Sequence, residues 1–128
     1  MPEWYEQILE LQLRENQDRW AVLEERGLAD GAELQLGFVY LGPGQKEAEE
    51  LTSFLRDETD YEVQARLQRL GEIGEEGWVV LGVTQPVALS LEMIDDWVEW
   101  MVAAGAAEGP CAFDGWEVVG ARLDAPGK

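Results

Sequence analysis

The amino-acid sequence predicts an α+β fold in which an N-terminal helix precedes the order β-α-β-β-α-β. Two nearly continuous apolar runs, Leu34–Leu41 and Trp78–Val83, are typical of central strands with both faces covered. An amphipathic helix, Gln45–Asp57, follows the first run, and a second helix, Leu91–Ala104, follows the other. This order is the split βαβ arrangement of the ferredoxin-like fold. In that fold a four-stranded antiparallel sheet carries two helices on one face.

The remaining elements complete this order. Residues Glu3–Arg26 contain neither Pro nor Gly and predict the extra N-terminal helix, which Gly27 ends. The apolar pattern of this helix is interrupted at Glu15–Gln17, which indicates a break there. Tyr61–Leu67 alternates apolar and polar residues, so we expect a half-exposed strand near a sheet edge. Residues Cys111–Val119 predict the last strand.

We expect a single domain over residues 1–128, because this length suffices for one hydrophobic core. Residues 1–30 form the helical extension, 33–120 the ferredoxin-like core and 121–128 a tail. The lone Cys111 cannot form an internal disulfide, which suits a reducing compartment. Neither a signal peptide nor an apolar run of the ~20 residues that a membrane helix needs is present. The expected location is therefore the cytoplasm.

The charge balance restricts the partners. The chain has 27 Asp and Glu against 9 Lys and Arg, which gives a formal net charge of -18. Such a protein repels phosphate backbones and anionic membranes, and it attracts basic proteins. We therefore expect a basic protein partner, with no direct nucleic-acid contact and no membrane contact. Monomer and dimer both remain open.

The residue types also restrict the chemistry. The chain has no His, which excludes Ser-His-Asp and Cys-His catalysis and His-ligated zinc, and a single Cys excludes Cys-rich zinc sites. Asp95 and Asp96 are adjacent in a helix and do not face one another, so they form a poor acid–base pair. We expect a protein that is not an enzyme, with no catalytic residue, cofactor or metal. A carboxylate-dependent metal hydrolase is the less favoured alternative.

The helix Leu91–Ala104, which Ser90 caps, has one acidic face and a broad apolar one. No Lys or Arg lies within it to neutralise the acidic face. This face is either solvated surface or the contact for a cationic partner. Trp100, at its border, either anchors an Arg-rich segment or packs inside the protein. The acidic residues are Glu92, Asp95, Asp96 and Glu99.

The same helix carries two adjacent apolar stripes, together wider than packing on a sheet requires. The first faces the sheet, and we expect Ile94 and Trp97 to be buried. The second could receive the N-terminal helix, a second copy of the chain or a partner. Its members are Met93, Trp97, Trp100 and Ala104.

Asp114, Gly115 and Trp116 form a short motif in the last predicted strand. It could be a recognition site, but a structural role is favoured. Gly115 permits an unusual φ or a bulge, Asp114 bonds to backbone, and Trp116 packs, mostly buried, on the sheet.

Several segments in fixed order carry a resemblance to a known family. They are the helical stretch Asn16–Gly27, Phe38–Leu41, Ala48–Leu55, Tyr61–Val63, Leu91–Asp95 and Phe113–Trp116. Over roughly residues 16 to 120 the chain resembles the ribonuclease E inhibitor family, named for regulator of ribonuclease E activity B. The Asp-Gly-Trp motif is the most specific piece. Gly42-Pro43-Gly44 departs from the family pattern, and the residues before Asn16 form an extension.

The resemblance implies an acidic, cytoplasmic, ferredoxin-like protein. Such a protein binds the endoribonuclease and lowers its RNA-cleaving activity without being an enzyme. A different binding class stays open beside it: an immunity-type or accessory protein for another basic partner.

Overall fold

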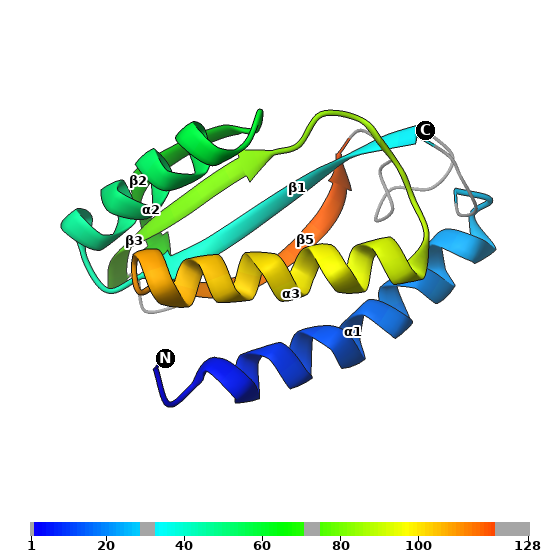
Figure 1. Ribbon diagram of the computed structural model, residues 1–128, viewed down its shortest axis with the longest axis horizontal. Helices are drawn as coiled ribbons and strands as arrows, with labels where there is room; N and C mark the ends of the chain where they lie inside the picture. Colours follow the sequence, from blue (N-terminus) through cyan, green and yellow to red (C-terminus); the bar gives the residue numbers. More distant parts are fainter. Residues whose placement is uncertain (1, 29–32, 71–74, 120–128) are drawn as a thin grey trace.

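The computed structural model describes residues 2–28, 33–70 and 75–119. An N-terminal helix precedes an antiparallel sheet with two helices packed on it (Figure 1), which confirms the predicted α+β class and its ferredoxin-like order. The expected tail 121–128 lies outside the described residues, as do residues 29 and 30 at the end of the expected helical extension. The elements are α1 (Tyr5–Glu25), β1 (Glu33–Gly42), α2 (Gln45–Glu58), β2 (Glu62–Leu70), β3 (Glu75–Val83), β4 (Val87–Ala88), α3 (Leu91–Glu108) and β5 (Ala112–Val119).

The sheet is antiparallel throughout, with β1 at its centre. β3 and β5 pair with β1, and β2 pairs with β3, so the strands lie in the order β2-β3-β1-β5. The two apolar runs are therefore central and β2 lies at the edge, as predicted. A short strand that the sequence did not predict, β4, pairs Val87 with Leu34, where it continues the line of β3 along β1.

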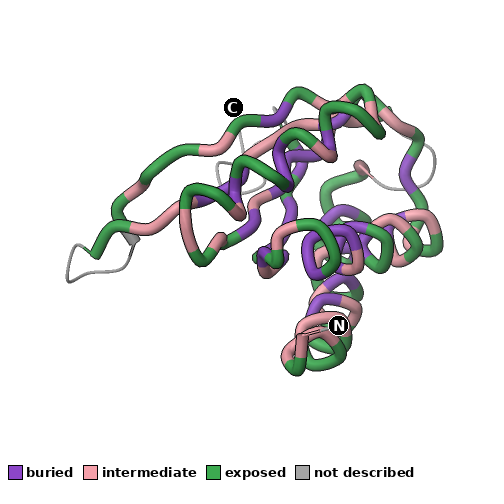
Figure 2. The backbone as a smooth tube through the Cα atoms, turned by 60° about the vertical axis from the view of Figure 1, so that its left-hand side comes forward, coloured by how far each residue is buried: buried purple, intermediate pink, exposed green. Residues whose placement is uncertain are grey.

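Both crossover helices lie on the same face of the sheet, as predicted. Tyr40 of β1 donates a 2.8 Å hydrogen bond to the carbonyl oxygen of Met101 in α3. Gly42, two residues on and thus on the same face, lies against Ala48 of α2. Buried positions concentrate between the sheet and these helices (Figure 2). The alternate residues of β1 form the opposite face, which we call the open sheet face.

Helix α1 packs beside α3 and next to β5, so it widens the helical layer (Figure 1). It is one continuous helix from Tyr5 to Glu25, and the predicted break at Glu15–Gln17 is wrong. The apolar pattern is interrupted because α1 turns polar residues, Gln12 and Asn16, toward the protein. Both are buried, at 3% and 0% exposed.

Helix α3 begins as predicted and ends later than predicted. The Ser90 hydroxyl accepts a 3.1 Å hydrogen bond from the Met93 amide, which is the expected N-cap. The helix continues through Gly105 to Glu108, so Gly105 does not end it. A Cβ at Gly105 would stand 2.5 Å from Tyr40 Cε2, and this close approach explains the glycine. No helix in the described part of the chain is long and apolar enough to cross a membrane.

Candidate binding surfaces

The predicted acidic face of α3 is divided by the fold. Glu92, Asp96 and Glu99 are exposed and share one side of the helix at i, i+4 and i+7 spacing. We call these three residues the outer α3 face. Within the part of the chain that the structure describes, no ion pair neutralises them. Asp95 differs from them because it is partly buried against α1.

Asp95 belongs to a hydrogen-bond chain that joins three elements. The Asn16 side-chain amide donates to Asp95 Oδ1 at 2.9 Å. The Asn16 Oδ1 atom accepts from Trp116 Nε1 at 2.7 Å. Asn16 thus links α1 to α3 and to β5 from a fully buried position. Asp95 is therefore not the fully solvent-facing residue that we expected, because its carboxylate bonds to α1, and its part in partner binding stays a prediction.

Trp100 lies next to α2, on the side of the outer α3 face opposite to Asp95. Its ring stacks on Phe54 of α2, with centroids 6.2 Å apart and planes inclined by 23°. Trp100 is nevertheless 42% exposed. The apolar stripe that includes Trp100 therefore faces α2, and the expectation that it could receive the N-terminal helix is wrong.

Trp97, one turn before, is less buried than predicted. It is only partly buried, although its ring packs edge-on against Phe38 of β1 and Phe113 of β5, with centroids 6.2 Å apart in each pair. Its indole nitrogen donates a 3.0 Å hydrogen bond to the Tyr61 hydroxyl. Ile94 and Trp116 are buried as predicted, at 0% and 5% exposed.

The Asp-Gly-Trp motif has the predicted structural geometry. The register between β1 and β5 shifts between Val39 and Tyr40, which leaves Asp114 as the extra residue of a bulge. Gly115 has φ +141°, a conformation that side chains rarely adopt. Arg19 of α1 lies over the Trp116 ring, 5.6 Å from its centroid. The predicted bond from Asp114 to backbone stays a prediction.

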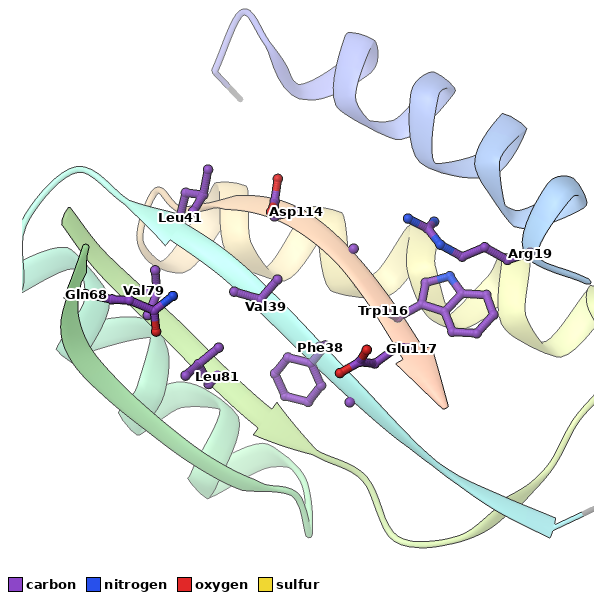
Figure 3. Close-up of a pocket in the computed structure, with 12 residues that line it drawn as sticks. Arg19, Phe38, Val39, Leu41, Gln68, Val79, Leu81, Asp114, Trp116 and Glu117 are labelled. Atoms are coloured by element: carbon purple, nitrogen blue, oxygen red, sulfur yellow. The ribbon is translucent and has the colours of Figure 1, made fainter. Parts of the chain in front are cut away.

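The open sheet face contains a depression of about 440 Å³ (Figure 3). Its floor is apolar and consists of Val39 and Leu41 of β1 with Val79 and Leu81 of β3. Gly37 and Gly115 also line it, and neither has a side chain to fill the space. A second depression of about 500 Å³ adjoins it and shares Gly37, Phe38, Leu81 and Glu117.

Polar groups surround this floor unevenly. Asp114 and Glu117 stand on the β5 side, and Gln68 stands on the β2 side (Figure 3). Burial raises the pKa of the Asp114 carboxyl, Glu15 raises it further, and Arg19 lowers it. The Arg19 guanidinium does not compensate fully, because it also pairs with Glu15 at 3.3 Å. The β5 side of the depression thus carries two carboxylates, Asp114 and Glu117, beside one cation that already has an ion-pair partner.

The described residues contain no group of three or more carboxylate or Cys side chains arranged to hold a metal ion. Burial raises the pKa of the Cys111 thiol to about 11, and Glu47 and Glu50 add to the shift. A thiol with so high a pKa is a poor nucleophile near neutral pH.

Several residues of these surfaces were missed from the sequence. Phe54 and Val39 occupy ordinary helix and strand positions, and nothing in their spacing indicates that they contribute to a surface. Asn16 gave a weak signal, because it lies where the apolar pattern of the N-terminal helix is interrupted, and Arg19 gave none. Trp100 was identified from helical spacing alone.

No protein-family model matches the chain, and no curated protein matches it. Function is therefore inferred from the fold and its surfaces.

Proposed function

We propose that this protein is an acidic, non-enzymatic regulator that binds a basic protein, in the manner of the inhibitors that bind ribonuclease E and lower its RNA-cleaving activity. One observation carries the proposal: the outer α3 face exposes three carboxylates, with no ion pair to them from the described residues, beside the exposed Trp100. A charged surface next to an exposed aromatic ring is a common composition for an interface that recognises cations.

Three further observations support binding through charge. The net charge of -18 attracts basic surfaces over long distances. Among the described cations, Arg14 and Arg19 pair with Glu10 and Glu15 of their own helix. Arg56 donates two hydrogen bonds to the Val63 carbonyl oxygen. These cations therefore do not screen the outer α3 face.

The test is the kinetics of binding to purified ribonuclease E at two salt concentrations. The screening length falls from about 30 Å at 0.01 M salt to about 10 Å at 0.1 M. We expect association to slow by at least about tenfold over this range, with dissociation changing less. Trp100→Leu should mainly raise the dissociation rate, because it removes a contact ring and leaves the charge unchanged.

Charge reversal on the outer α3 face locates the interaction. The double variant Asp96→Lys, Glu99→Lys should weaken binding much more than the control Glu24→Lys, Glu25→Lys. Both pairs are exposed, and both change the net charge by the same amount. Equal weakening by the two would show that only the total charge matters. Full binding by the outer-face variant would refute the proposed surface, and inhibition of RNA cleavage measured in parallel tests the regulatory role.

A second candidate is an immunity-type or accessory protein for a different basic partner. The same surface would serve it, so absence of binding to ribonuclease E together with tight binding to another basic protein would favour it. The metal-dependent hydrolase gains no support from the described residues, which contain no group of three or more Asp, Glu or Cys side chains that could hold a metal ion. Unchanged thermal stability with Mg²⁺, Mn²⁺ or Ca²⁺ would count further against it.

A further inference from the structure

The open sheet face lies on the opposite side of the sheet from α2 and α3 and contains depressions with an apolar floor. Leu41, next to the last residue of β1, is 37% exposed, and Val119 at the β5 end is equally exposed. Its two adjoining depressions, of about 440 and 500 Å³, are each within the range of sites that bind small groups.

The pairing registers show why this depression exists. Across the sheet, one row runs Gly115, Val39, Leu81 and Gln64. The next row runs Glu117, Gly37, Val83 and Glu62. Each row therefore has a glycine at or beside β1 where a side chain would otherwise stand. The first depression, which we call the hollow, therefore lies between β5 and β3 and has short apolar side chains as its floor.

The charge at the edge of the hollow is asymmetric. The β5 side carries Asp114 and Glu117. The β2 side carries Gln68 in the first depression and Glu62 in the second, and Arg66 lies opposite Val79 in the neighbouring row. Among the described residues, Arg19 is the one cation that lines the first depression, where it pairs with Glu15 and lies over Trp116, and Arg56 lines the second. A ligand that crosses the hollow should therefore be apolar over its length and positive at the β5 end.

We propose that the open sheet face is a second docking surface for the basic partner, and that its hollow receives a lysine side chain of that partner. This inference rests on the proposed function, which supplies the basic partner. A lysine has a four-carbon apolar stem and a compact ammonium head, so the stem covers the Val and Leu floor and the head reaches Asp114 and Glu117. An arginine of the partner should bind less well here, because the Arg19 guanidinium already lies over the Trp116 ring.

The test uses an oligo-lysine peptide and the whole ¹⁵N-labelled chain. Backbone amide shifts should change on both docking surfaces, the outer α3 face and the open sheet face around Val39, Leu81 and Gly115. The same peptide with acetylated lysines keeps the stems and loses the charge, and should give no such change on the sheet.

Variants then separate local from total charge. Asp114→Asn with Glu117→Gln should weaken oligo-lysine binding about threefold to tenfold, since each exposed charge pair contributes modestly. The control Glu24→Gln with Glu25→Gln removes the same charge elsewhere and should weaken binding less than about twofold. Val39→Thr, which makes the floor polar at nearly constant volume, should also weaken binding. Circular dichroism checks that each variant is folded.

The outcomes distinguish the two proposals. Shift changes confined to α3 would overturn the sheet-face inference and leave the proposed function intact. Equal weakening by the test and control pairs would also overturn the inference, because total charge would then explain binding. Absence of binding to any basic peptide or to ribonuclease E would remove both proposals. Sheet-face shifts that the Asp114 and Glu117 variant abolishes would support both.

Discussion

Replacing Asn16 tests how α1 is held on the rest of the protein. In Asn16→Ala the Trp116 indole nitrogen and the Asp95 carboxylate lose the hydrogen bonds of 2.7 and 2.9 Å that they make with Asn16. Trp116 is 5% exposed, so its nitrogen has little access to replacement water. A buried group left without a partner costs about 1–3 kcal/mol, and Asp95 is only partly buried. We expect the free energy of unfolding to fall by about 2–4 kcal/mol.

Urea denaturation followed by Trp fluorescence measures this loss. Gln17→Ala is the matched control, because Gln17 is exposed on the same turn, and its effect should stay within about 0.5 kcal/mol. A double-mutant cycle with Trp116→Phe isolates the bond to the indole nitrogen and should give a coupling above about 0.5 kcal/mol. A loss below about 1 kcal/mol for Asn16→Ala, or no coupling, would refute the assigned hydrogen-bond chain.

Two further predictions concern α3 and its C-terminal connection. Gly105→Ala should destabilise the fold by about 1–3 kcal/mol despite the higher helix propensity of Ala, because its Cβ would stand 2.5 Å from Tyr40 Cε2 and 2.6 Å from the Cys111 carbonyl oxygen. Ala107→Gly, at an exposed site of α3, measures the effect of helix propensity alone in the same denaturation assay. An increased free energy of unfolding for Gly105→Ala would contradict the packing argument. Burial raises the pKa of the Cys111 thiol from 9.0 to about 11, so the folded state holds this proton more tightly than the unfolded state. The contribution of this proton to the free energy of unfolding is fully present below pH 9 and is lost as the pH rises toward 11. The variant Cys111→Ala should lack this pH dependence. Rapid labelling of the folded protein by iodoacetamide at pH 8 would contradict the high pKa of the thiol.

The sequence predicted the sheet well because strand identity follows from local pattern. The runs Leu34–Leu41 and Trp78–Val83 are apolar on both faces, and only central strands fit such a pattern. The Ser90 cap was also local, since the hydroxyl and the amide it accepts from lie within one turn. The residue at which α3 ends could not be predicted from the neighbouring sequence. Gly105 resembles a helix stop in sequence, and only its contact with Tyr40 explains why the helix continues past it.

The candidate surfaces were predictable only in part. Helical spacing placed Glu92, Asp96 and Glu99 on one side and Trp100 beside them, because α3 is regular. Spacing could not show that the Asp95 carboxylate accepts a hydrogen bond from Asn16, which is 79 residues distant in the sequence. The hollow of the open sheet face was equally out of reach. It depends on which glycines fall in adjacent rows, and that register is fixed by pairing across three strands.

The division of the acidic α3 face changes how its function must be tested. A charge reversal that includes Asp95 would place a Lys against the Asn16 amide inside the contact between α1 and α3. Binding could then be lost because α1 detaches, and the result would say nothing about recognition. Asp96 and Glu99 carry no such structural role in the described part of the chain. Reversing Asp96 and Glu99 should therefore weaken the partner complex with the free energy of unfolding nearly unchanged, whereas Asp95→Lys should lower both together.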